Sequence, residues 1–418
     1  SSGAKLKFNY KDGLVQSIKD HSGREWYFSY NKASYLSSIS LGSNVERSYA
    51  YDTLQIEERY GLALSSIKDA NSNTLESFSY NKEAQLTSHS ELENVYEYIW
   101  HSKSQIEIID SRQESYLYAL DDNGHISQIV YPDGSSENIF WDKEKNSSLK
   151  NTRGGNQELR VYDEQSRLLS FSRNEEIEEV YTYAKRHREP LSYKSKKEHT
   201  HYTYDENHNL ITISYKDGSC VNYQRDKKGS IISVSNANAE ITSYEYNFQG
   251  QIKKVTTPLK QSQTFEYDDL GRVIKETSAK GEVQTFVYNQ KDAIVSVSNR
   301  EDESITFAYA KNQNLVSITD PAGRITAYTY DEYNRVVKKS NPKEYADSTD
   351  EIKQQEEFYS YNANNTVKEI IRVDGSRVKF TYDSNENIIH VIATDQEGKT
   401  EEQNYRYDVL SNLEEATN

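Results

Sequence analysis

The residue pair best suited to bind a metal ion is His199 and His201. If their segment is a strand, a spacing of two puts both imidazoles on one face. Such a pair could hold zinc or copper. His208 follows a few residues later. The alternative is two imidazoles on a solvent-exposed face beside a turn, and the sequence leaves open whether the pair binds metal.

Two other segments look like parts of ligand-binding loops. Asp121 to Gly124 (Asp-Asp-Asn-Gly) resembles a fragment of a calcium loop, but it lacks the remaining oxygen ligands and the closing Glu. Arg153 to Asn156 (Arg-Gly-Gly-Asn) would need a following helix to cradle a phosphate. Asp, Asn and Gly are also the residues that turns favour, so both segments are predicted to be turns.

The sequence contains no recognisable catalytic arrangement. No Ser or Cys lies in a nucleophile elbow, and neither an HExxH motif nor a P-loop occurs. The many carboxylates are dispersed along the chain, although a pair could still assemble across strands. We therefore predict that the chain is not an enzyme. We predict no catalytic, cofactor-binding or metal-ligating residues and no cofactor.

A Tyr-Asp-like dipeptide returns every 21 residues and determines where all these residues must lie. From Leu120 to Tyr330 the interval holds ten times in succession. The positions in this regular part are Leu120, Trp141, Tyr162, Tyr183, Tyr204, Arg225, Tyr246, Tyr267, Tyr288, Tyr309 and Tyr330. Looser copies lie at Tyr30, Tyr51, Tyr80, Trp100, Tyr361, Tyr382 and Tyr407. A fixed period over most of a chain indicates one small unit stacked on itself.

Each unit carries the signals of two strands and two turns. A second aromatic often stands two residues before the anchor, as Phe265 does before Tyr267, so that both rings share one strand face. We expect these rings to stack in rows with their equivalents in adjacent units. A flexible residue such as Gly271 follows the anchor by four positions, and an aliphatic such as Val273 follows it by six. Another glycine often precedes the anchor by seven, in several cases in an Asp-Gly pair, which is a strong hairpin signal.

These signals predict an all-β chain of tandem 21-residue β-hairpins, without helical periodicity. Residues 1–418 would form a single array of about 19 repeats. With strands ~4.8 Å apart, its sheet would be roughly 180 Å long. Because sheets twist, we expect this long antiparallel sheet to curl or spiral into a hollow shell, or part of one.

Composition supports a thin, wet sheet. Apolar residues make up 34% of the chain, but its 35 tyrosines favour strands and bury large rings. A net charge of −16 disfavours partners that need basic patches, such as nucleic acid or anionic membranes. The single cysteine, Cys220, cannot form an internal disulfide. There is no apolar run long enough for a membrane span and no signal peptide. The absence of methionine suggests an internal or processed piece of a larger protein.

Segments such as Thr264 to Glu276 (TFEYDDLGRVIKE) and Thr319 to Val336 (TDPAGRITAYTYDEYNRV) closely resemble the YD-repeat, or RHS-repeat, family. The resemblance covers almost the whole chain. The family includes Rhs polymorphic toxins, toxin-complex shells and teneurins. It implies hairpins side by side in a sheet that spirals into a hollow shell. In bacteria such shells enclose a toxic C-terminal domain. The family's Asp-Pro-rich C-terminal cleavage segment has no counterpart, because Asp320-Pro321 is the only Asp-Pro pair and lies at an ordinary turn position.

Two breaks in the rhythm are the best leads to a partner site. Tyr51 to Tyr80 spans 29 residues, and Tyr330 to Tyr361 spans 31. The second interval contains a highly charged stretch, Asn341 to Glu357. Insertions in repeat proteins map to loops where partners often bind, although a tolerated solvent loop is the alternative.

We therefore expect a structural wall of a secreted or surface-delivered protein, exported by a bacterium. Its partners would be an enclosed C-terminal effector, absent from this chain, or neighbouring shell segments. The alternative is a cell-surface adhesion module whose exposed aromatic strip binds a glycan or a protein.

Overall fold

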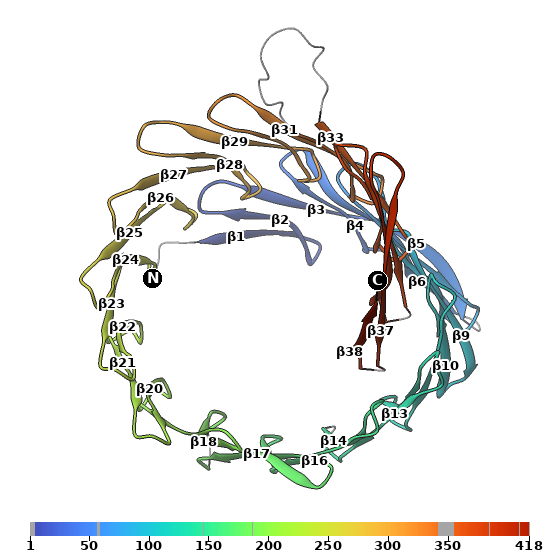
Figure 1. The fold of residues 1–418 in the computed structure, drawn as a ribbon, viewed down its shortest axis with the longest axis horizontal. Helices are drawn as coiled ribbons and strands as arrows, with labels where there is room; N and C mark the ends of the chain where they lie inside the picture. Colours follow the sequence, from blue (N-terminus) through green and yellow to red (C-terminus); the bar gives the residue numbers. More distant parts are fainter. Residues whose placement is uncertain are drawn as a thin grey trace. The chain divides into compact units, whose positions relative to one another are not determined.

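The computed structural model describes residues 5–56, 59–144, 146–185, 187–341, 355–383, 385–408 and 410–417. Over these residues the chain forms 38 strands of one sheet and no helix (Figure 1). The prediction of an all-β fold is confirmed. Among the described residues, no helix is long and apolar enough to cross a membrane.

The strands are short and follow one another at close intervals. They are β1 (Leu6–Lys11), β2 (Leu14–Asp20), β3 (Glu25–Tyr30), β4 (Leu36–Leu41), β5 (Asn44–Ile56), β6 (Arg59–Lys68), β7 (Thr74–Tyr80), β8 (Leu86–Glu91), β9 (Asn94–Ser102), β10 (Gln105–Ile109), β11 (Ser115–Leu120), β12 (Ile126–Val130), β13 (Ser136–Trp141), β14 (Ser147–Asn151), β15 (Gln157–Tyr162), β16 (Leu168–Arg173), β17 (Glu176–Tyr183), β18 (Pro190–Ser195), β19 (His199–Tyr204), β20 (Leu210–Tyr215), β21 (Cys220–Arg225), β22 (Ile231–Ser235), β23 (Ile241–Tyr246), β24 (Ile252–Thr256), β25 (Ser262–Tyr267), β26 (Val273–Thr277), β27 (Val283–Tyr288), β28 (Ile294–Ser298), β29 (Ser304–Tyr309), β30 (Leu315–Thr319), β31 (Ile325–Tyr330), β32 (Val336–Asn341), β33 (Gln355–Tyr361), β34 (Val367–Ile371), β35 (Arg377–Tyr382), β36 (Ile388–Thr394), β37 (Thr400–Tyr407) and β38 (Leu413–Thr417).

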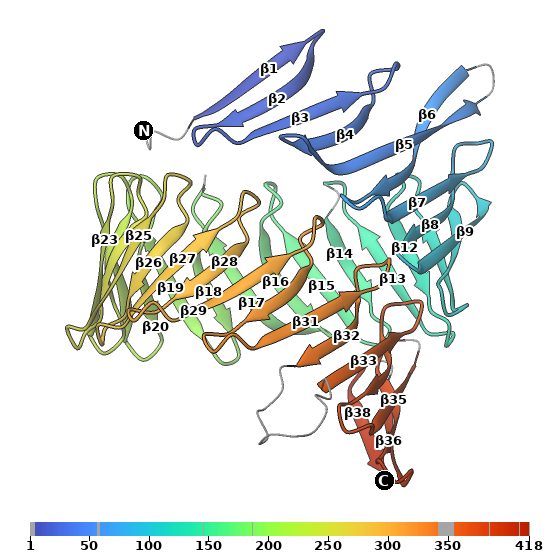
Figure 2. The ribbon, with the colours of Figure 1, turned by 90° about the horizontal axis from the view of Figure 1, so that it is seen from above.

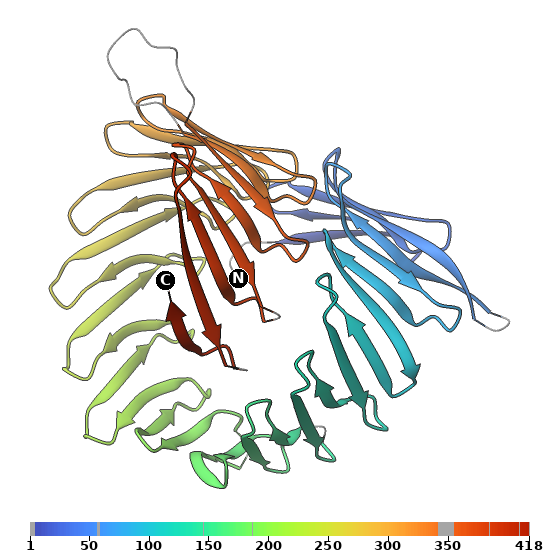
Figure 3. The ribbon, with the colours of Figure 1, turned by 45° about the vertical axis from the view of Figure 1, so that its right-hand side comes forward.

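The strands belong to two compact units. Unit 1 comprises Tyr118–Gln284. Unit 2 combines the segment that ends at Leu117 with the segment that begins at Thr285. Within each unit, strands that follow one another in the chain pair antiparallel, as β23–β24 and β24–β25 do in unit 1. Figure 3 shows the hairpins of the N-terminal segment of unit 2 lying side by side in chain order.

Both turns of a repeat share the same pair of backbone hydrogen bonds, and the turn after the anchor shows them together with a shift of the ladder. After Tyr267, the Asp268 N–H bonds to the carbonyl of Arg272, and the Gly271 N–H bonds back to the carbonyl of Asp268. Gly271 has φ +83°, which only glycine adopts without strain. The ladder is also shifted between Glu266 and Tyr267. This combination is a type I turn with a G1 bulge, so the Asp-Gly signals mark three-residue loops.

The side chains along a strand alternate in exposure. In β25, Phe265 and Tyr267 are half-buried, whereas Glu266 between them is exposed. Among the described residues no large side chain is fully buried, and the buried apolar residues are Leu41, Ala70 and Val378. The sheet is therefore thin, and its stability must be spread over many small contributions.

The expected rows of directly stacked rings are wrong. Tyr246 pairs with Ile252 of β24, and the equivalent Tyr267 stands on β25, the strand beyond. Two strand spacings are about 9.6 Å, which exceeds the distance at which rings touch. The intervening strand therefore separates equivalent rings of adjacent repeats.

The two predicted insertions differ in form. The first lengthens β5 and β6 into a hairpin that projects beyond its neighbours (Figure 2), with pairing continuing from Tyr51↔Leu64 to Ile56↔Arg59. Most of the second, residues 342–354 of the stretch Asn341 to Glu357, lies outside the described residues. At its ends Asn341 pairs with Gln355, so β32 and β33 continue the sheet.

Candidate functional site

Most anchor tyrosines join their repeat to the one before it. The Tyr267 hydroxyl donates to the carbonyl of Ile252, the first residue of the neighbouring strand, at 2.6 Å. Tyr330 does the same to Leu315 at 2.8 Å. The tyrosines with this bond are Tyr30, Tyr51, Tyr80, Tyr162, Tyr204, Tyr246, Tyr267, Tyr309, Tyr330, Tyr361 and Tyr382. Trp100 and Trp141 donate through Nε1, which explains why Trp can replace Tyr as the anchor.

Replacing Tyr330 with Phe tests this bond directly. The ring stays, but the carbonyl of Leu315 loses its donor, so the free energy of unfolding should fall by about 1 kcal/mol. Chemical denaturation at neutral pH measures the change. Phe265→Tyr is the control, because it adds a hydroxyl to a half-buried ring outside the series of anchor bonds. A Tyr330→Phe variant as stable as the parent would contradict a structural role for the hydroxyl.

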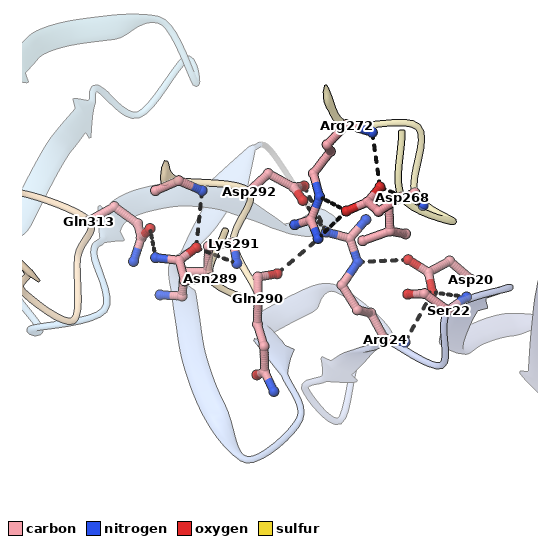
Figure 4. Close-up of polar contacts among 12 residues, drawn as sticks. Asp20, Ser22, Arg24, Asp268, Arg272, Asn289, Gln290, Lys291, Asp292 and Gln313 are labelled. Atoms are coloured by element: carbon pink, nitrogen blue, oxygen red, sulfur yellow. Dashed lines mark hydrogen bonds and ion pairs between the residues drawn. The ribbon is translucent and has the colours of Figure 1, made fainter. Parts of the chain in front are cut away.

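The aspartate after the anchor closes the turn. Oδ1 of Asp268 accepts the N–H groups of Leu270 at 2.9 Å and Arg272 at 3.0 Å. Oδ2 accepts from Nε of Arg272 at 2.7 Å, as Figure 4 shows. Where Asn replaces Asp, its amide oxygen accepts the same two N–H groups, as Asn247 does. The turn therefore needs the side-chain oxygen of this Asp or Asn as an acceptor. The negative charge of Asp adds an ion pair where an Arg stands four residues later.

The residue after the flexible turn position reaches the next repeat. Arg167 donates through Nη1 to the carbonyl of Ala184 at 2.9 Å. The Gln251 amide donates to the carbonyl of Gly271 at 2.8 Å. Arg335 donates to the carbonyl of Asn362 at 3.4 Å. Each link runs from one turn to the equivalent turn of the following repeat, so this position also has a structural role.

Hydrogen bonds in the turns lower the pKa of several carboxylates. Burial alone would raise the pKa of Asp20, but hydrogen bonds from Ser22 and Arg24 lower it from 3.8 to about 2. Burial would also raise the pKa of Asp133, but hydrogen bonds from Ser135 and Arg153 lower it to about 2. Other turn aspartates with a lowered pKa are Asp121, Asp142, Asp163, Asp205, Asp217, Asp268, Asp320, Asp374 and Asp408.

A lowered folded-state pKa stabilises the protein above the unfolded-state pKa, and this stability is lost as the pH falls through the folded-state value. We expect the midpoint of thermal unfolding to hold above about pH 5 and to fall steeply between about pH 4 and pH 2. Far-UV circular dichroism at a series of pH values measures it. A midpoint that stays constant down to pH 2.5 would show that these carboxylates do not stabilise the folded state.

Unit 2 contains a second set of polar contacts, which we call the seam. The seam joins turns of its N-terminal segment to turns of its C-terminal segment. Arg24, in the turn between β2 and β3, contacts both carboxylate oxygens of Asp292 at 2.7 Å (Figure 4). Lys291, from the same turn as Asp292, pairs with Glu46. These residues are about 250 positions apart in the chain.

The seam continues in order along both segments. Nδ2 of Asn312 lies 3.5 Å from Oδ2 of Asp69, and Nη2 of Arg335 lies 2.9 Å from Oε2 of Glu93. Further on, Nη1 of Arg112 donates to the carbonyl of Asp383 at 3.2 Å. Side chains of the N-terminal segment thus meet the Tyr-Asp turns of the C-terminal segment through polar and ionic contacts.

The comparisons with known proteins agree with this architecture. The sequence profile of the teneurin YD-shell family matches residues 143–300 and, in a second alignment, 186–332. The repeat continues on both sides of the matched part, with the same anchor bond at Tyr30 and Tyr382. Over residues 143–332 the chain therefore resembles the teneurin YD-shell family. No curated protein matches the sequence of this YD-repeat chain.

One solved structure supports the same fold. The YD-repeat chain is similar to the crystal structure of TcdB2-TccC3 without its hypervariable C-terminal region, with a TM-score of 0.50 and 10% identity over 97% of this chain. A Photorhabdus luminescens Tc holotoxin pore gives a TM-score of 0.48 and 10% identity over 98%. The YD-repeat chain spans 30% of the length of both solved chains. At this identity the likeness shows the fold alone.

The structure brings the predicted histidine pair together. His199 and His201, at the start of β19, have ring centroids 4.5 Å apart. His199 is half-buried and His201 exposed. His208 lies in the turn beyond the opposite end of this strand. In the described part of the chain, no group of three or more His, Cys, Asp or Glu side chains is placed to hold a metal ion.

The other sequence candidates lie in turns. Asp121 accepts the N–H groups of Asn123 and His125, so its carboxylate closes its own turn. The Arg153 to Asn156 segment is the turn between β14 and β15, and Arg153 pairs with Asp133. Asp320 accepts the N–H groups of Ala322 and Arg324 in the turn before β31. Cys220 is half-buried at the start of β21.

Sequence reasoning missed two sets of residues. The seam residues carry no local signal, because their partners lie in distant repeats. His187 was also missed, although it lies 21 residues before His208 and Nδ1 atoms of the two rings are 3.0 Å apart. The period itself could have revealed this second pair.

Proposed function

We propose that this chain is a wall segment of a YD-repeat shell that encloses an effector belonging to the same secreted or surface-delivered protein. The observation that carries the proposal is the use of the Tyr-Asp motif. The hydroxyl of Tyr267 and the amide of Gln251 hold one repeat to the next, and the carboxylate of Asp268 closes the turn between two strands. A motif used in this way builds a continuous wall rather than a reaction centre.

The polar character of the sheet supports the same proposal. Half-buried side chains and exposed charges, with no large fully buried side chain among the described residues, suit a sheet with water on both faces. The net charge of −16 keeps such a wall soluble. The similarity to TcdB2-TccC3 supports a shell-like fold, and enclosure of an effector is our extension from it.

Solution scattering of this chain tests whether the array forms a curved wall or a compact globule. A compact globule of 418 residues would have a radius of gyration of ~22 Å, whereas a curved wall should give a value well above it. A value at or below that figure would mean a solid core, and the shell proposal would fail.

Enclosure of an effector is tested by protease digestion of the complete protein that carries this chain. A protease should leave the effector segment intact while the wall is folded, and should digest the same segment when it is expressed alone. Equal digestion in both settings would reject encapsulation. The alternative, an adhesion module, predicts instead that the 418-residue chain retains a glycan or protein ligand on its exposed strip.

A further inference from the structure

Two histidines at equivalent turn positions of adjacent repeats face each other in unit 1. His187 follows the anchor Tyr183 by four residues, and His208 follows Tyr204 by four. Their ring centroids are 4.1 Å apart and their planes are nearly perpendicular, at 82°. The two Nδ1 atoms are 3.0 Å apart. The repeat geometry therefore places two potential metal ligands side by side.

Backbone contacts hold both turns in place. The His208 N–H bonds to the carbonyl of Asp205 at 3.0 Å, and His208 has φ +65°, the conformation that glycine adopts at this position in later repeats. The His187 N–H bonds to the carbonyl of Ala184 at 3.2 Å. Arg167 also donates to the carbonyls of Ala184 and His187, so the preceding repeat fixes the first turn.

We propose that His187 and His208 chelate a divalent transition-metal ion, copper(II) in preference to zinc(II). An ion about 2.0–2.1 Å from each nitrogen, with the nitrogens 3.0 Å apart, has an N–metal–N angle of roughly 90–97°. This is the angle between neighbouring ligands in a square-planar or tetragonal site, which copper(II) and nickel(II) favour. Tetrahedral zinc(II) would require the rings to move apart.

Without an ion, one Nδ1–H group donates to the other Nδ1 atom. Metal binding requires the donor ring to carry its proton on Nε2 instead, so that both Nδ1 lone pairs face the ion. The described residues supply no third His, Cys, Asp or Glu to this pair, so water completes the coordination. The ion would cross-link the turn between β17 and β18 to the turn between β19 and β20.

The test is titration of the whole chain with copper(II) alone, in a buffer that does not bind copper, followed by calorimetry and electron paramagnetic resonance. We expect a copper site with two imidazole nitrogens among its equatorial ligands. His187→Gln and His208→Asn should each weaken binding by at least about tenfold, because a chelate loses one of its two ligands. Asn suits the positive φ of residue 208, and circular dichroism confirms folding.

The matched control is the double variant His199→Gln with His201→Gln, which removes the other close pair of rings. It should retain the site. The proposal is overturned if the parent chain shows no two-imidazole site, if the His187 and His208 variants bind as the parent does, or if the control variant alone loses binding.

Discussion

Replacing Arg335 with Ala is expected to lower the local free energy of unfolding by about 2–4 kcal/mol. The guanidinium pairs with Asp331 of its own turn at 2.8 Å and with Glu93 across the seam at 2.9 Å. It also donates to Oδ1 of Asn365 at 3.1 Å and lies over the Tyr361 ring. Its side chain is only 13% exposed. Alanine would leave the carboxylates of Asp331 and Glu93 and the amide oxygen of Asn365 without this donor.

Hydrogen exchange of the amides in β31–β34 measures the loss, because unfolding of a repeat array need not be two-state. The matched control is Arg324→Ala. Arg324 makes the same ion pair with the aspartate four residues before it, at 2.6 Å, but its side chain is 52% exposed. An exposed pair contributes under about 1 kcal/mol. Equal losses in the two variants would show that the contacts of Arg335 beyond its own turn contribute nothing.

The strands and turns could be predicted from the sequence because their determinants are local. Gly271, with φ +83°, marks a turn through its own backbone conformation, and Asp268 marks it by bonding residues two and four positions ahead. Tyr267 reaches only as far as Ile252 on the neighbouring strand. Because these interactions are short-range, they favour the same residue type at the same position of successive repeats, and the 21-residue period makes this visible in the sequence.

The seam could not be predicted in this way. The period states which repeats are neighbours along the chain, but the turns that meet across the seam depend on the twist accumulated over many strands. Arg24 and Asp292 are 268 residues apart, and either could have served an ordinary turn. The expected rows of rings do not form for a simpler reason, because another strand lies between equivalent positions of adjacent repeats.

Of the two close histidine pairs, one was predicted from the sequence and the other was not. The pair His199 and His201 followed from strand alternation, and the structure places their rings together. The pair His187 and His208 follows from the period, because equivalent turn positions of adjacent repeats are spatial neighbours. Applying the 21-residue offset to every histidine would have found it from the sequence.

Removing the turn acceptor itself is expected to have an effect of similar size. In Asp268→Ala, the N–H groups of Leu270 and Arg272 lose their acceptor, and the guanidinium of Arg272 loses the carboxylate oxygen 2.7 Å away. Two lost backbone bonds and one charged contact should lower the free energy of unfolding by about 2–3 kcal/mol. Hydrogen exchange in β25 and β26 measures it at neutral pH.

Asp268→Asn separates the acceptor from the charge. Asn247 shows that an amide oxygen accepts the same two N–H groups, at 3.0 Å each, so this variant should lose only about 1 kcal/mol. The pKa of Asp268 is lowered, since hydrogen bonds and the charge of Arg272 outweigh the opposing effect of burial. Its charge-dependent stabilisation is therefore present at neutral pH and lost in acid. The difference between the parent and Asp268→Asn should shrink below about pH 4, whereas Asp268→Ala should stay destabilised at every pH. If Asn and Ala prove equally damaging at neutral pH, the turn depends on the charge of residue 268 and not on its oxygen acceptor.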